Sequence, residues 1–175
     1  MPRFSLTTVA SAGLESTYAT VCNPGSYQSL MPHHYPSVRV MSVRGDTSVA
    51  EEHVVLDGRE LVMMAKHVAT PPYRHETFVI GGDAKGSHIV HELAGAAEYA
   101  KPEPGASAAH PPKPRTVITT AVDLRTGRLG MPSWMRGGRD SLRESFAQIM
   151  AELAQAAEEE EYGSSSSSSR DSEGA

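Results

Sequence analysis

Residues 36–93 read PSVRVMSVRGDTSVAEEHVVLDGRELVMMAKHVATPPYRHETFVIGGDAKGSHIVHEL and alternate strand-like segments with turn signals. The clearest turn signal is Asp57-Gly58, because Asp-Gly between alternating hydrophobic residues is typical of a tight β-hairpin. Gly45-Asp46, Pro71-Pro72 and the run from Gly81 to Gly86 mark the other turns. We therefore predict a run of antiparallel strands at Pro36–Arg44, Ser48–Leu56, Arg59–Ala69, Arg74–Ile80 and Ser87–Leu93.

The flanking segments complete the fold. Arg3–Val9 reads as a strand, two short helical segments follow it, and Thr116–Leu124 is a β-branched strand. The last helix has an apolar stripe at helical spacing: Leu142, Phe146, Ile149, Met150, Leu153 and Ala157. This helix is the one element long enough to cover the apolar face of such a sheet. We predict an α+β fold of order β-α-α-β6-α, in which a curved antiparallel sheet of about seven strands wraps around the C-terminal helix and leaves space beside it.

We expect one domain at residues 1–157, with a proline-rich insertion at 98–115 and a tail at 158–175. Proline cannot donate to a β-ladder, so the insertion is expected to be an irregular loop between two paired strands. Glu158–Glu161 places negative charge at the C-terminal end of a helix, where it opposes the helix dipole, so this end is expected to fray. The serines at 164–169 predict disorder beyond it.

The composition excludes several classes of protein. A formal net charge of -5 over 175 residues argues against a nucleic-acid partner, which usually meets a basic face. Cys22 is the one cysteine, so neither a disulfide framework nor a cysteine-based zinc cluster is expected. The chain shows no signal peptide and no run of 18 apolar residues, which predicts a cytoplasmic protein with no integral membrane span.

Three segments carry a resemblance to a known superfamily. CNPGSYQSLMP at residues 22–32, the hairpin in Glu51–Met64 and the hairpin from Phe78 to Val90 resemble parts of the START-like (SRPBCC) helix-grip superfamily. The polyketide cyclase/dehydrase-like and coenzyme-Q-binding-like branches look nearest. The resemblance spans residues 1–157 and implies the fold. It does not imply one function, because the superfamily hosts lipid carriers, hormone binders, cyclases and hydrolases.

Two motifs that suggest chemistry have simpler interpretations. GGDAKGS at 81–87 resembles a phosphate loop, but its lysine precedes the last glycine and strands flank it, so we interpret it as a hairpin turn. Eight histidines suggest a metal site. His88 and His91 are three apart on a strand and point to opposite faces, and adjacent His33 and His34 are expected to do the same. We predict no metal site and no cofactor, although a site joining His67 and His75 across the Pro71-Pro72 turn remains open.

The sequence indicates no catalytic set. Glu51 and Glu52 alternate on a strand, so one of them points inward in either register. An inward carboxylate in an apolar cavity has a raised pKa and can act as an acid or base. The simpler interpretation is pairing with Arg59, Lys66 or Arg74 on neighbouring strands. Cys22 is most simply a core residue.

The candidate ligand-binding residues are mostly apolar. On Arg59–Ala69, Glu60 and Lys66 share one parity, so we place Leu61, Met63, Ala65 and His67 on the inward face. Methionine suits irregular apolar walls, and tyrosine offers a hydroxyl at a cavity mouth. The predicted set is Tyr27, Leu61, Met63, His67, Tyr73, Phe146 and Met150, with plain core packing as the alternative for each. Either His67, Glu51 or Tyr73 is expected to orient the polar end of a ligand, and the Tyr27–Tyr35 loop is a candidate lid.

Three hypotheses on function follow. The first is a soluble protein that holds a hydrophobic small molecule, such as a lipid, isoprenoid quinone or polyketide-like compound, between sheet and helix. The second is a polyketide cyclase, aromatase or dehydratase that moves protons with an inward Glu or His. The third is an interaction domain with a filled core and no cavity.

Overall fold

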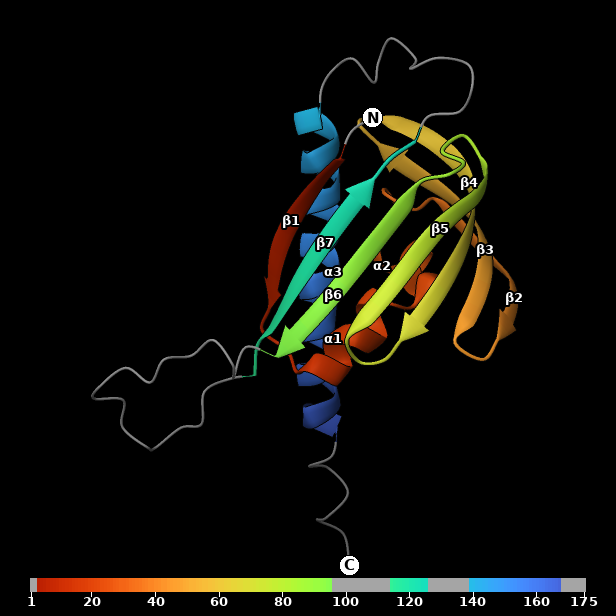
Figure 1. Cartoon of the computed structure of the whole chain (residues 1–175). Helices are drawn as coiled ribbons and strands as arrows, with labels where there is room; N and C mark the ends of the chain where they lie inside the picture. Colours follow the sequence, from red (N-terminus) through yellow and green to blue (C-terminus); the bar gives the residue numbers. More distant parts are fainter. Residues whose placement is uncertain (1–2, 96–113, 126–138, 168–175) are drawn as a thin grey trace, which may run out of the picture.

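The computed structural model describes residues 3–95, 114–125 and 139–167, which form one curved sheet with helices on its concave side (Figure 1). The sheet has seven antiparallel strands in the order β1-β7-β6-β5-β4-β3-β2. This arrangement confirms the predicted helix-grip fold. The strands are β1 (Arg3–Ala10), β2 (Ser37–Arg44), β3 (Thr47–Leu56), β4 (Arg59–Thr70), β5 (Arg74–Gly82), β6 (His88–Gly95) and β7 (Thr116–Asp123). The helices are α1 (Leu14–Val21), the 3-10 turn η1 (Pro24–Ser26), α2 (Tyr27–Leu30) and α3 (Arg139–Ser167).

The turn chemistry explains the hairpins. Asp57 and Gly58 have φ of 52° and 71°, and a two-residue type I′ turn needs a positive φ at both positions. Leu56 consequently pairs with Arg59. Strands β6 and β7 also pair directly, from Gly95 opposite Thr116 onward, so the long segment between them does not break the hairpin. Most of the expected proline-rich insertion, residues 98–113, lies outside the described residues.

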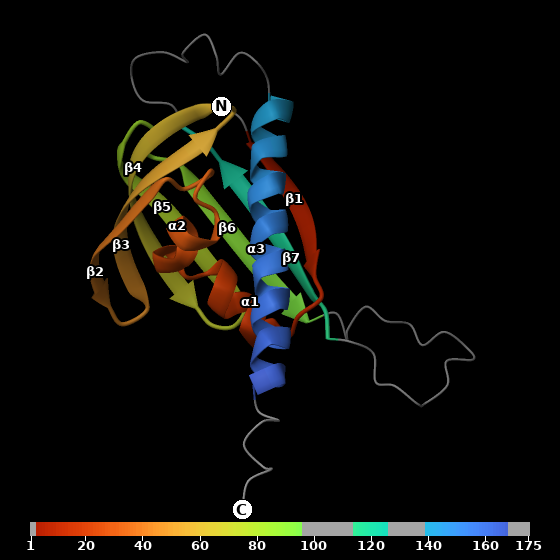
Figure 2. The same cartoon turned by 180° about the vertical axis from the view of Figure 1, so that it is seen from behind.

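Helix α3 crosses the concave face of the sheet (Figure 2). The predicted stripe is buried along its whole length: Leu142, Phe146, Ile149, Met150, Leu153 and Ala157. The Phe146 ring meets Phe4 of β1 edge-on, with 5.7 Å between ring centroids. Each Å² of apolar surface removed from water contributes about 25 cal/mol to stability, and this burial holds α3 against the sheet. In the part of the chain that the structure describes, no helix combines the length and apolar character that a membrane span needs.

The prediction that the acidic run frays is wrong, because α3 continues to Ser167. Glu158 accepts a hydrogen bond from the Ser11 backbone N–H at 2.6 Å, and Glu161 accepts one from Gly13, also at 2.6 Å. Gly13 is the N-cap of α1 and has no side chain that could cap it. The carboxylates of α3 therefore satisfy free N–H groups near the start of α1, and these charge-assisted bonds outweigh the unfavourable dipole. Of the expected disordered tail, residues 168–175 lie outside the described part.

Candidate ligand-binding site

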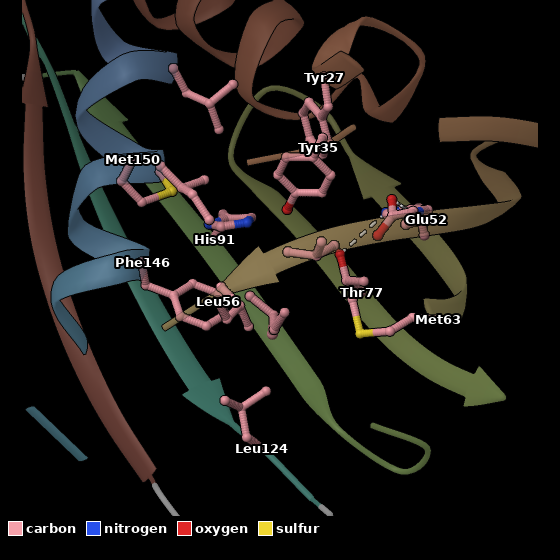
Figure 3. A pocket seen from close by; sticks show the side chains of 15 residues that line it. Tyr27, Tyr35, Glu52, Leu56, Met63, Thr77, His91, Leu124, Phe146 and Met150 are labelled. Carbon is pink, nitrogen blue, oxygen red and sulfur yellow. Dashed lines mark hydrogen bonds and ion pairs between the residues drawn. The ribbon is translucent and has the colours of Figure 1, made fainter. Parts of the chain in front are cut away.

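The interior between the sheet and α3 holds a small cavity (Figure 3). Phe146 and Met150 project from α3 toward the sheet, while Tyr27 and Tyr35 close one end. The cavity volume is about 30 Å³. Pockets that hold drug-sized ligands measure roughly 300–1,000 Å³, whereas a water molecule needs about 10–15 Å³ by the same kind of measure. In this conformation the cavity has room for one or two water molecules.

The structure brings most of the predicted ligand-binding residues to this cavity. Tyr27, Met63, His67, Phe146 and Met150 line its wall. Leu61 faces inward as expected and is 6% exposed, but it packs in the core and does not line the cavity.

Tyr73 is the predicted residue that the structure places elsewhere. It is 61% exposed and lines a separate surface hollow with Gly13 and the acidic end of α3. It lies in the turn before β5, where strand alternation does not fix the direction of a side chain. Tyr73 is therefore not positioned to orient a ligand in the cavity.

A row of buried polar side chains crosses the inner face of the sheet. His67, His75 and His91 stand on β4, β5 and β6, and their rings stack with centroid separations of 5.3 and 5.9 Å. Glu52 on β3 extends the row at one end, and Thr120 on β7 extends it at the other. Side chains on alternate positions of a strand share a face, and direct pairing of His75 with His91 and of His91 with Thr120 aligns them. We call these five residues the histidine row.

One end of the histidine row is a buried acid–imidazole pair. Glu52 Oε1 lies 3.0 Å from His67 Nε2, and both side chains are less than 5% exposed. The two atoms face each other at ion-pair distance without hydrogen-bond alignment. The other ring nitrogen of His67, Nδ1, is 3.2 Å from the Thr77 hydroxyl. This pair confirms that one of the adjacent glutamates points inward. Glu51 points outward and lies 3.5 Å from Arg39.

The middle of the histidine row lacks hydrogen-bond partners. His75 is 1% exposed, and neither of its ring nitrogens has a partner among the described residues. A buried polar atom without a partner costs about 1–3 kcal/mol. Burial, and then the neighbouring His91 and His67, lowers the pKa of His75 to about 3. Burial and His67 similarly lower the pKa of His91 to about 4. Both imidazoles are neutral near pH 7, so each carries one donor and one acceptor nitrogen.

Two tyrosines and the cysteine near the cavity remain protonated at neutral pH. Burial raises the pKa of Tyr27 and of Tyr35, and the nearby Glu52 carboxylate adds to the shift at Tyr35. The Tyr27 hydroxyl donates to the Val21 carbonyl at 2.5 Å. Burial raises the pKa of the Cys22 thiol to about 12, so Cys22 is not a thiolate nucleophile.

An open cleft reaches the histidine row from outside. It has a volume of about 350 Å³ and lies between the segment Cys22–Gly25 and the β2–β3 turn. His67 and His75 are among the residues that line it, and His67 also lines the internal cavity. His67 thus borders both the internal cavity and a cleft that opens to solvent.

Sequence reasoning left part of this arrangement unpredicted. His75 was expected only as a partner of His67 across the turn, and the structure does stack these two rings. His91 and His88 do point to opposite faces, since His91 is 7% exposed and His88 stacks on Phe78 at the outer face. The alternation within β5, where His75, Thr77 and Val79 share one face, was the signal available for His75.

The expectation that His33 and His34 diverge is wrong. They lie in the loop after α2, outside any strand, so alternation does not apply to them. His33 Nε2 lies 2.9 Å and His34 Nε2 lies 3.5 Å from Glu152 Oε1 on α3.

Comparisons with known proteins agree on the fold. No protein-family model matches the sequence, and no curated protein matches it either. A START superfamily protein from Mycobacterium smegmatis superposes with a TM-score of 0.64 at 13% identity, covering 88% of this chain and 97% of its own. The Zhui aromatase/cyclase from Streptomyces sp. R1128 gives 0.61 at 11%, covering 90% and 93%. A protein from Thermus thermophilus gives 0.63 at 14%, covering 90% and 95%. At such identities the likeness concerns architecture and does not separate one branch from another. The chain has the START-like (SRPBCC) helix-grip fold.

Proposed function

We propose that this protein binds an apolar small molecule with a polar, hydrogen-bonding group, such as a quinone, a polyketide-like ring or a lipid, between the sheet and α3. The observation that carries the proposal is the histidine row. His75 has two buried nitrogens without hydrogen-bond partners among the described residues. It lines the open cleft, while its neighbours His67 and His91 line the mostly apolar cavity. A ligand hydroxyl, for example that of a phenol, would donate to or accept from one of these nitrogens.

The apolar walls supply the affinity. Phe146, Met150 and Leu153 from α3 face Met63 and Val54 from the sheet. Each methylene moved from water to such a site contributes about 0.8 kcal/mol. Methionine side chains are unbranched and flexible, so Met63 and Met150 can rearrange around different ligands. A chain of modest length then reaches micromolar affinity after the ordering costs.

Binding requires the cavity to widen, because about 30 Å³ does not hold a ligand of this size. The open cleft offers the route, since His67 and His75 already line it. A ligand that enters there meets the imidazoles first and then displaces the side chains behind them. Binding along this route selects a conformation of the protein in which the cavity is wider.

The first experiment is mass spectrometry of the purified protein, in its native state and after solvent extraction. A stoichiometric apolar compound supports the proposal and gives the ligand class. Binding of an environment-sensitive apolar dye is then compared in two variants. Met150→Trp fills the cavity, and Val62→Trp places the same indole at a position 40% exposed. Loss of dye binding in the first variant alone is the expected result. No co-purifying compound together with no dye binding overturns the proposal and favours a filled interaction domain.

The Glu52–His67 pair favours a second candidate, an acid–base enzyme of the cyclase or dehydratase kind. A carboxylate and an imidazole 3.0 Å apart at a cavity wall can pass a proton to and from a poly-keto substrate. The discriminating variant is Glu52→Gln, which keeps shape and removes the base. Retained binding with lost turnover supports the enzyme, whereas equal loss of both supports a purely structural pair.

A further inference from the structure

We propose that His33, His34 and Glu152 form a binding site for a divalent transition-metal ion of the Zn²⁺ type. Their ligand atoms lie within 4.8 Å of one another. The two imidazole Nε2 atoms approach the same carboxylate oxygen, at 2.9 and 3.5 Å. Ligands around a tetrahedral zinc ion at 2.0–2.1 Å are about 3.3 Å apart. The observed spacings lie on both sides of that value, so a small shift of Glu152 opens the coordination position.

The ligands come from elements that are already ordered. In the loop after α2, the backbone N–H groups of His34 and Tyr35 both donate to the Met31 carbonyl, at 3.0 and 2.7 Å. The His34 carbonyl accepts from the Val55 N–H of β3 at 2.8 Å, which ties the loop to the sheet. Glu152 stands on α3, whose neighbouring residues Met150 and Leu153 are buried. Because the three side chains start from fixed backbones, little ordering is needed on binding.

The ligand types indicate the class of ion. Two neutral imidazoles and one carboxylate suit zinc and the neighbouring transition metals, while Mg²⁺ and Ca²⁺ prefer oxygen ligands alone. The His33 side chain is 63% exposed, so water has access to the remaining coordination position. The other histidine–glutamate pairs in the described residues each bring only one imidazole to a carboxylate: His53 with Glu60, His67 with Glu52 and His88 with Glu76. The convergence of two imidazoles distinguishes the proposed site from an ordinary surface pair.

A bound ion would link helix α3 with the loop that follows α2. Tyr35, the next residue in the loop, lines the internal cavity, and so do Met150 and Leu153 on α3. Bound metal would therefore hold together two walls of the cavity. The metal site itself does not depend on the proposed ligand, and its test needs no ligand.

The test is titration of the full chain with Zn²⁺ by calorimetry, after a chelator has removed metal ions. We expect saturable binding of one ion per chain at micromolar concentrations and a rise in Tm with Zn²⁺. The main variants are His33→Asn and Glu152→Gln, because both side chains are partly exposed and their loss spares the core. Each is expected to weaken binding by about tenfold or more. His53→Gln removes a histidine from a pair with Glu60 and is the matched control, with unchanged affinity.

A second readout uses Co²⁺ as a coloured substitute for Zn²⁺. Four-coordinate Co²⁺ absorbs visible light far more strongly than hydrated Co²⁺, so an intense spectrum that His33→Asn abolishes supports the site. Three results overturn the proposal: no saturable Zn²⁺ binding up to concentrations on the order of 100 µM, equal affinity in wild type and the double variant His33→Asn/Glu152→Gln, or a loss in His53→Gln as large as in the main variants.

Discussion

Strands β5 and β6 carry a polar network on each face, and the two networks differ mainly in their access to water. On the outer face Arg74 contacts Glu92 at 2.8 Å and Glu76 at 3.2 Å, and His88 contacts Glu76 at 3.1 Å. On the inner face His75 and His91, one position away along the same strands, are nearly inaccessible. The outer groups are paired and hydrated, whereas the ring nitrogens of His75 have no hydrogen-bond partner among the described residues.

The difference shows what burial does to the same kinds of side chain. Outside, the Arg74 guanidinium lowers the pKa of Glu76, and water screens the pair. Inside, desolvation lowers the pKa of His75 and His91 by a larger amount and keeps both rings neutral. Buried polar groups without full pairing are costly to stability and are concentrated at functional sites. The inner row is therefore where function is expected.

The largest expected effect comes from Glu52→Ala. The change leaves His67 buried without its acidic partner, and breaking one side of a buried pair costs about 3–5 kcal/mol in the free energy of unfolding. Urea unfolding followed by circular dichroism measures it. The matched change outside is Glu92→Ala, which removes a partner of Arg74 and should have at most about a fifth of that effect. Equal losses in the free energy of unfolding from the two variants would contradict this difference between the inner and outer faces.

The next effect is a loss of stability at mildly acidic pH. The pKa of His75 is lowered to about 3 and that of His91 to about 4, from 6.5 in the unfolded chain. Above pH 6.5 both histidines are neutral in the folded and the unfolded chain, so their burial costs no stability through protonation. As the pH falls toward the pKa values of the folded state, stability is lost because the unfolded chain binds protons first. At pH 5 each histidine costs about 2 kcal/mol.

His75→Leu isolates this effect. Leucine removes two unpaired nitrogens, so stability at pH 7 is expected to stay equal or rise. The fall between pH 7 and pH 5 should shrink by about 2 kcal/mol, as measured by urea unfolding at several pH values. The range stops at pH 5 because Glu76 and Asp123, whose pKa values are lowered by Arg74 and Arg3, lose their own contribution below that. An unchanged slope in the variant would remove His75 from the explanation.

The fold could be predicted because its determinants are local. The Asp57-Gly58 turn, the alternation in β4 and the stripe on α3 each lie within a few residues of sequence, and together they set the element order. The same local patterns pointed Met63, His67, Phe146 and Met150 inward. They said nothing reliable about Tyr73, because a turn residue has no strand parity.

The histidine row could not be predicted, because it depends on registers between strands. Glu52 meets His67 although its direct partner on β4 is Met63, and a register shift between Met64 and Ala65 changes how β4 meets β5. The approach of His33 to Glu152 joins residues 119 positions apart. The hydrogen bonds from the acidic end of α3 to the start of α1 are equally long-range, which is why the helix-dipole argument alone gave the wrong answer for Glu158–Glu161.

The hydrogen bonds that Glu158 and Glu161 accept near the start of α1 give a smaller expected effect on stability. They also allow a charge paired within the protein to be compared with a charge surrounded by water. Glu161→Ala removes the acceptor for the Gly13 N–H at the start of α1, and loss of a helix cap costs about 1 kcal/mol. Glu159, two residues earlier, accepts a hydrogen bond from Gln155 of its own helix, and Glu159→Ala should cost under about 0.5 kcal/mol. Thermal unfolding of the two variants side by side measures the difference. If both lower Tm equally, general helix propensity explains the loss and the cap does not.

The smallest effect on stability is expected from the outer network, and its dependence on salt concentration distinguishes it from the others. Arg74 bridges Glu76 and Glu92 at a surface where water reaches all three groups. Exposed ion pairs are weakened by screening, and at about 1 M salt the Debye length falls to about 3 Å, comparable to the contacts themselves. Arg74→Gln is therefore expected to change Tm slightly in dilute buffer and not measurably at high salt, whereas the loss from Glu52→Ala should persist because its pair is buried. A loss of Tm from Arg74→Gln that does not depend on salt would mean that the Arg74 side chain stabilises the outer face by packing against the strands and not by its charge. The difference between the two faces would then come from the burial of atoms and not from the hydration of charges.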